Sequence, residues 1–176
     1  YSQKNRHYHT LSHLENMLDL ATQNRVPVED WDTFILTIFY HDAVYQAVKS
    51  DNEEKSAELA EKRLLQICFP KPQIVSCKEW ILATKTHQTS SSNTCNLFLD
   101  IDLSVLGAPW ERYQEYARQI RKEYMIYPDF LYKPGRKKVL ERFLEREVIF
   151  KTLEFREQLE VQARNNIQQE IATFLA

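Results

Sequence analysis

Glycine is almost absent from this sequence, which has only Gly107 and Gly135 in 176 residues. A P-loop or a dinucleotide-binding turn needs several glycines within a short stretch, so both kinds of nucleotide-binding site are excluded. Alternating runs of β-branched residues are also few, whereas Glu, Lys, Gln, Leu and Ala are frequent. Because these frequent residues favour helices, the sequence predicts an all-α fold.

Cysteine is scarce as well, and Cys68, Cys77 and Cys95 form no C-x-x-C pair. An odd number of separated cysteines is typical of reduced thiols in a cytoplasmic protein, and it argues against a disulfide framework or a thiolate zinc site. No apolar run has transmembrane length, so no membrane is expected as a partner. The formal net charge of −2 gives no electrostatic reason to expect nucleic acid either.

The length of the chain and the lack of an internal repeat or a domain boundary predict a single domain over residues 1–176. Asp51 followed by Glu54 resembles a capping box, and Gly107 is well placed as a helix terminator. The segment 25–28 is predicted to be a connector, 88–94 a polar loop and 128–136 a turn-rich link. The predicted helices cover about 10–23, 29–45, 51–67, 73–87, 97–107, 109–127, 137–150 and 154–174.

The most informative stretch is Phe39-Tyr-His-Asp42, at the end of an apolar segment that begins at Trp31. The segment is so apolar that His41 and Asp42 are both expected to enter the protein interior. Buried imidazole and carboxylate groups need partners, and a divalent metal ion suits both.

Other histidines and aspartates in the chain are candidates to complete such a site. His9 and His13 are four residues apart, so they share a face if both are helical. Either histidine can be the first ligand. Asp100 and Asp102 lie in an apolar helix, where they point to different faces, so only one is expected to bind metal. The other can orient a histidine from behind.

Four sequence blocks together resemble the HD superfamily of metal-dependent phosphohydrolases, and more narrowly an uncharacterised branch of it. The only departure from the branch pattern is Tyr40, which stands between Phe39 and His41. The resemblance covers almost the whole chain and implies an HD-type helical bundle of about five core helices, with extra helices at its C-terminal end. The blocks are Arg6-His-Tyr-His-Thr-Leu-Ser-His13, Phe39-Tyr-His-Asp-Ala-Val-Tyr45, Asp51-Asn-Glu-Glu-Lys-Ser-Ala57 and Asp100-Ile-Asp-Leu-Ser-Val-Leu-Gly107.

Carried over residue by residue, the resemblance implies a metal site formed by His13, His41, Asp42 and Asp102. His9, His87 and Asp100 are the alternative or supporting ligands. Imidazole and carboxylate ligands suit Mn, Fe, Co, Ni, Zn or Mg. The implied reaction is hydrolysis of a phosphate ester or anhydride, in a nucleotide or a related small molecule, by attack of a metal-bound hydroxide.

Such a reaction also needs an acid or base and cationic contacts to the phosphate. Glu53 is the candidate acid or base, although a first-turn glutamate can equally serve only the helix dipole. Arg6 and Lys85 are the catalytic and substrate-binding cations, with His87 as a further substrate contact and Arg136 as a weaker phosphate candidate.

Two other functions are compatible with the same residues. Some HD-fold proteins are di-iron oxygenases, which need extra ligands. Ala43 beside the His41-Asp42 pair argues against this class, whereas His9 and His87 argue for it. The chain could also be a non-catalytic, metal-stabilised sensor or interaction module, a class that predicts no turnover of any phosphate substrate.

Overall fold

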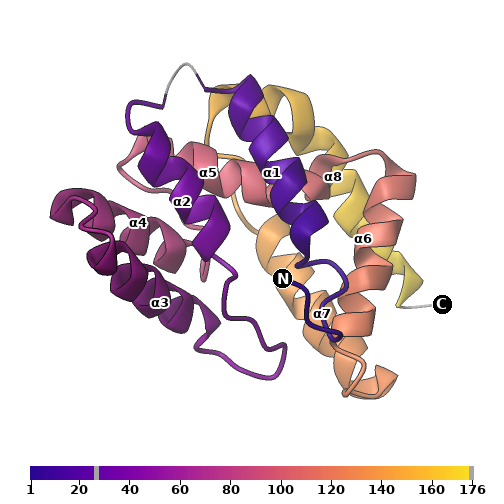
Figure 1. The fold of residues 1–176 in the computed structure, drawn as a ribbon. Helices are drawn as coiled ribbons and strands as arrows, with labels where there is room; N and C mark the ends of the chain where they lie inside the picture. The colour runs from indigo at the N-terminus through magenta and orange to yellow at the C-terminus, as the bar shows by residue number, and fades with distance from the viewer. Residues whose placement is uncertain (26–27, 175–176) are drawn as a thin grey trace. The chain divides into compact units, whose positions relative to one another are not determined.

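The computed structural model describes residues 1–25 and 28–174. Within these ranges all regular structure is helical, which confirms the predicted all-α class (Figure 1). None of the described helices is both long and apolar enough to cross a membrane. The connector predicted at 25–28 includes residues 26 and 27, which lie outside the described ranges. The elements are α1 (Leu11–Gln23), α2 (Trp31–Tyr40), α3 (Asn52–Gln66), α4 (Lys71–Ala83), α5 (Asn93–Leu103), the 3-10 helix η1 (Ser104–Gly107), α6 (Trp110–Glu123), α7 (Asp129–Leu144) and α8 (Leu153–Thr173).

Packing divides the chain into two compact units, Tyr1–Ile101 and Asp102–Ala176. The division falls in the last turn of α5, which is one continuous helix from Asn93 to Leu103. The first unit contains α1 to α4 and most of α5, and the second contains η1 and α6 to α8. That the chain is one functional domain stays a prediction.

In the first unit, α2 is shorter than predicted and ends at Tyr40. Its beginning is fixed by Asp30, whose carboxylate accepts hydrogen bonds from the backbone N–H of Thr33 at 3.1 Å and from its hydroxyl at 2.6 Å. The helix does not continue to Tyr45 because the backbone N–H groups of Val44 and Gln46 donate to side chains of α3 instead of to carbonyls one turn back.

The core of the first unit includes the interface between α3 and α4, where the small residues Ala57 and Ala60 are fully or almost fully buried beside Ile81. The capping box predicted at the start of α3 is wrong. Among the described residues the Asp51 carboxylate caps no helix N–H group, and it instead pairs with the Lys55 ammonium at 2.7 Å.

Two helix boundaries in the first unit also differ from the prediction. Helix α4 ends at Ala83, and the chain continues in turns as far as His87, whose φ of 49° is in the left-handed region. Helix α5 begins at Asn93, inside the stretch predicted to be a polar loop. The hydroxyl of Ser92 accepts from the Cys95 N–H at 3.2 Å, so a serine of this polar stretch satisfies an N–H of the first turn.

In the second unit, the turn-rich link predicted at 128–136 is wrong, because α7 begins at Asp129 and passes through Pro134. Proline in a helix removes a hydrogen bond and disfavours the helix by about 3 kcal/mol. Tertiary contacts offset this cost: Tyr132 is buried on α7, and the Arg136 guanidinium forms a buried ion pair with Glu170 of α8 at 2.8 Å.

Gly107 packs against α8 and does not have the backbone conformation of a helix-terminating glycine, since no glycine in the described residues has positive φ. A β-carbon built on Gly107 would lie 2.6 Å from Leu159 Cβ and 2.9 Å from the Leu159 carbonyl oxygen. Asn166 of α8 reinforces this contact by donating to the carbonyls of Leu106 and Ala108, both at 2.8 Å. Glycine is therefore required here for close approach.

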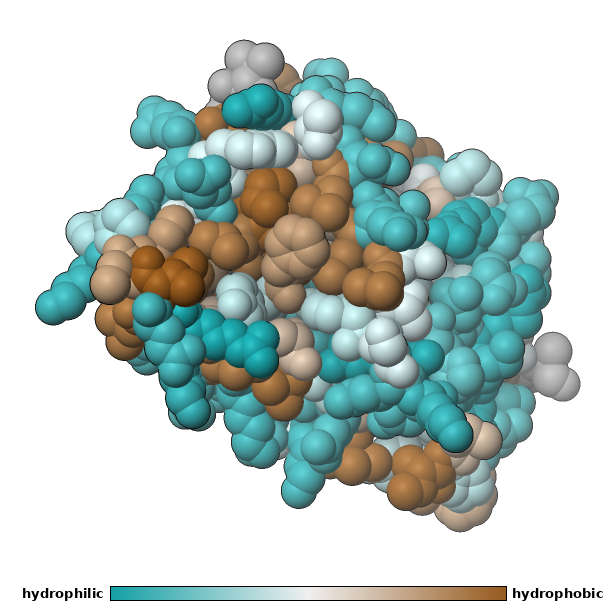
Figure 2. All heavy atoms as spheres, in the orientation of Figure 1, coloured by the Kyte–Doolittle hydropathy of each residue, from teal (hydrophilic) through white to brown (hydrophobic). Residues whose placement is uncertain are grey.

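Apolar side chains remain at the surface in places, and they appear as brown atoms among the teal ones in Figure 2. On the face that Figure 2 shows, several of these brown residues adjoin one another. The most exposed large apolar residues are Met125, Ile126, Phe130, Leu153 and Val161 in the second unit and Ile67 in the first.

Candidate metal centre

Three side chains with the chemistry of metal ligands come together from α1, α2 and α5. His13 lies on α1, His41 is the C-cap of α2, and Asp102 is in the last turn of α5. One ligand atom from each lies within 4.8 Å of the other two, and within the described residues this group could hold a metal ion. His13 and His41 are only 4% and 1% exposed, and Asp102 is half-buried.

His13 reaches this position because it lies on the buried face of α1 with Leu14, Met17 and Ala21. His9 does not share that face as a helical residue, because it precedes the N-cap Thr10. Its ring nevertheless lies 5.9 Å from the His13 ring, centroid to centroid. The group contains His13 and Asp102, and it contains neither of their predicted rivals, His9 and Asp100. Asp100 precedes Asp102 by two residues on α5 and is fully buried.

The hydrogen bond of His41 fixes its tautomer. Nδ1 of His41 lies 2.8 Å from the carbonyl oxygen of Ile38. Because a carbonyl oxygen can only accept, Nδ1 carries the proton and Nε2 of the neutral ring carries the lone pair. A metal-binding histidine commonly donates its other N–H to a carbonyl in this way. The donor set therefore fits a divalent metal ion.

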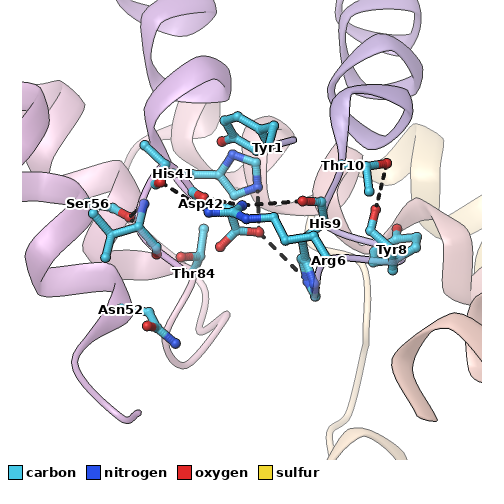
Figure 3. Close-up of polar contacts among 12 residues, drawn as sticks. Tyr1, Arg6, Tyr8, His9, Thr10, His41, Asp42, Asn52, Ser56 and Thr84 are labelled. Atoms are coloured by element: carbon cyan, nitrogen blue, oxygen red, sulfur yellow. Dashed lines mark hydrogen bonds and ion pairs between the residues drawn. The ribbon is translucent and has the colours of Figure 1, made fainter. Parts of the chain in front are cut away.

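Asp42 brings a carboxylate to the lone-pair side of His41. Its Oδ2 lies 3.3 Å from His41 Nε2 and 3.7 Å from His9 Nε2, as the dashed lines in Figure 3 show. Two acceptor atoms at this distance attract each other only when they share a proton or a metal cation. Asp42 is thus adjacent to His41 but is not a member of the group of His13, His41 and Asp102. Its role as a fourth ligand stays a prediction.

Arg6 is almost completely buried, and its guanidinium is committed to the backbone. It donates to the carbonyl oxygens of Asp42 at 2.7 Å, Ala43 at 3.1 Å and His9 at 3.3 Å. It also lies over the Tyr45 ring at 5.4 Å from the centroid. These bonds use the N–H donors that were predicted to bind phosphate. They support a role for Arg6 in holding together the segments that carry His9 and Asp42 (Figure 3).

The other residues predicted to bind substrate or to transfer a proton lie outside the group of His13, His41 and Asp102. The Lys85 ammonium is 42% exposed, forms a short ion pair with Glu54 and donates to the Ser50 carbonyl at 2.9 Å. The hydrogen bond to Glu54 raises the pKa of Lys85, so it stays cationic. Glu53 is half-buried in the first turn of α3, and His87 ends the turns after α4. Arg136, the weaker phosphate candidate, is paired with Glu170 in the second unit. The functional roles of Glu53, Lys85 and His87 stay predictions.

Two polar side chains of α3 received no role in the sequence analysis although they contact the loop after His41. Asn52 and Ser56 are buried and form hydrogen bonds to the backbone of Val44 and Gln46. A signal was present in the sequence: an asparagine and a serine four residues apart share a helix face, and here that face continues into the buried Ala60.

Comparisons with protein-family models, with curated proteins and with solved structures find no match to this chain. The candidate site therefore rests on the chemistry and geometry of its own residues. The resemblance to the HD superfamily stays a prediction from the sequence blocks.

Proposed function

We propose that the protein is a metal-dependent phosphohydrolase of the HD type, which cleaves a phosphate ester or anhydride in a nucleotide or a related small molecule. The observation that carries the proposal is the convergence of His13, His41 and Asp102, whose ligand atoms lie within 4.8 Å of one another. These residues belong to three of the four sequence blocks that resemble the HD family. Their meeting is what that resemblance requires.

In this proposal His13, His41 and Asp102 hold the metal ion, and Asp42 is the fourth ligand. Two imidazoles and two carboxylates are compatible with Mn, Fe, Co, Ni, Zn or Mg. When bound, the metal supplies a Lewis acid that lowers the pKa of water and neutralises charge on a phosphate.

The neighbouring side chains have distinct parts in the proposal. Nδ1–H of His41, held by the Ile38 carbonyl, keeps the ring in the tautomer that presents Nε2. Arg6 holds the backbone of Asp42 and Ala43 to the backbone of His9 through hydrogen bonds to their carbonyls. Glu53 is proposed to move a proton, and Lys85 to attract the phosphate as an exposed cation.

Asp42→Ala is expected to lower kcat/KM for hydrolysis by at least about 100-fold, because loss of even an outer-shell partner costs roughly 10–100-fold at metal sites. The assay measures phosphate release from a panel of nucleotides and from p-nitrophenyl phosphate, with the protein loaded in turn with Mn, Co, Ni and Mg. Asp19→Ala is the matched control, because it removes an exposed carboxylate from α1.

Retention of full activity by Asp42→Ala would contradict the proposed role of this carboxylate. If the wild-type protein binds metal but hydrolyses no member of the panel, the non-catalytic sensor or interaction module is favoured. An iron chromophore with more than one iron per chain would favour the oxygenase.

A further inference from the structure

In the loop that follows His41, side chains of α3 form hydrogen bonds with backbone N–H and carbonyl groups. The hydroxyl of Ser56 accepts from the N–H of Val44 at 3.0 Å and donates to its carbonyl at 3.2 Å. Asn52 binds the backbone of Gln46 in the same way. Its Oδ1 accepts from the Gln46 N–H and its Nδ2 donates to the Gln46 carbonyl, both at 3.0 Å. These contacts fix both polar backbone groups at two positions of the loop.

The two side chains belong to a firmly held part of α3. Asn52 is 9% exposed and Ser56 is fully buried. Four residues separate them, so they project from the same face of the helix. The following turns of α3 pack on α4 through Ala57 and Ala60. The bonds therefore attach the loop to a packed pair of helices.

The beginning of the loop is held from the other direction. Arg6 donates to the carbonyls of Asp42 and Ala43, so side chains bind the backbone at or next to every residue from 42 to 46. Asp42 is the residue whose carboxylate faces His41 Nε2 at 3.3 Å. A carboxylate on a loop needs such restraint to be a precise ligand, because site geometry is lost when the supporting contacts are loose.

We infer that Asn52 and Ser56 are positioning residues of the metal centre: by clamping Val44 and Gln46 they hold the Asp42 carboxylate where it meets the metal beside His41. This inference rests on the proposed metal site. It adds to that site the residues that position one of its ligands.

A purely structural clamp elsewhere in the first unit provides a matched control. Asn96 of α5 binds Ser90 as Asn52 binds Gln46: its Oδ1 accepts from the N–H at 2.8 Å and its Nδ2 donates to the carbonyl at 2.9 Å. The spacing of six residues is the same, and Asn96 is similarly buried at 7% exposure. The clamped backbone at Ser90 carries no proposed ligand.

The experiment compares Asn52→Ala, Ser56→Ala and Asn96→Ala with the wild-type protein. Thermal unfolding gives the stability of each, and titration with Co²⁺ and Mn²⁺ gives the dissociation constant. The visible absorption of the Co²⁺ form reports the number of ligands. Ser56→Ala is included because it removes only the hydroxyl and alanine favours the helix, so this variant should fold.

All three variants are expected to lose stability, but only Asn52→Ala and Ser56→Ala should weaken metal binding, by roughly 10–100-fold, and alter the Co²⁺ spectrum. Wild-type affinity in both of these variants would overturn the inference, as would an equal loss of affinity in Asn96→Ala. If the wild-type protein itself binds no metal, the metal site fails together with the inference. The wild-type titration therefore distinguishes the two kinds of failure.

Discussion

Glu170→Ala is expected to destabilise the protein by about 3–5 kcal/mol, the cost of removing one partner from a buried ion pair. Glu170 accepts from Arg136 Nε at 2.8 Å, from Arg136 Nη2 at 3.1 Å and from the Tyr113 hydroxyl at 2.5 Å. Burial, together with the Glu170 charge, raises the pKa of Tyr113, so its hydroxyl remains a donor. Without Glu170, the Arg136 charge would stay buried with much of its compensation lost.

Denaturant unfolding of three variants tests this expectation. Glu115→Ala breaks the exposed pair of Glu115 and Arg118, joined at 2.9 Å, and should leave stability nearly unchanged. The double variant Arg136→Met, Glu170→Leu should recover much of the loss, because apolar replacement of a buried pair avoids an uncompensated charge. A Glu170→Ala variant as stable as Glu115→Ala would show that the pair does not hold α7 to α8.

Gly107→Ala is the second substitution with a large expected effect, a loss of about 1–3 kcal/mol from overpacking. The new β-carbon would meet Leu159 Cβ at 2.6 Å, the Leu159 carbonyl oxygen at 2.9 Å and its Cα at 3.1 Å. Two of these atoms are backbone of α8, which cannot rotate away as a flexible side chain would. Relief requires a shift of α8 against η1, where Asn166 ties them together.

Gly135→Ala is the matched control, because nothing lies within 4 Å of a β-carbon at that position in α7. Alanine within a helix is favoured over glycine by roughly 0.5–1 kcal/mol, so this variant should be equally stable or more stable. Thermal and denaturant unfolding measure both variants. Equal stability of Gly107→Ala and wild type would mean that the close approach of η1 and α8 is not a constraint.

These two glycines show what the sequence could and could not predict. Their scarcity correctly indicated an all-α chain. The role of Gly107 was not predictable, because a glycine after an apolar helix is typical of a terminator, whereas the constraint here comes from Leu159, more than fifty residues later. Likewise, Pro134 and Gly135 indicated a turn, but the buried pair of Arg136 and Glu170 overrides local preference and continues the helix.

The candidate metal site, too, was predictable only in part. The polar interruption of an apolar segment pointed to His41, but donor type alone left His9 or His13 and Asp100 or Asp102 open. The resemblance to the HD superfamily selected His13 and Asp102, and the fold brings these two residues together with His41. The use made of Arg6 could not be predicted, since the sequence does not reveal that backbone carbonyls of residues 42 and 43 face its guanidinium. The clamp by Asn52 and Ser56 was missed for the same reason: it depends on where the α2 helix stops.

The central claim, that His13, His41 and Asp102 form a metal centre, is tested most directly by the metal content of purified protein. Elemental analysis after loading with Mn, Fe, Co, Ni, Zn or Mg and dialysis compares wild type with His13→Ala and Asp102→Ala. His7→Ala is the control, because His7 is a half-buried histidine of the same segment outside the group. We predict bound metal in the wild type and in His7→Ala and its loss from both ligand variants. Full metal content in folded His13→Ala and Asp102→Ala would contradict the proposed centre.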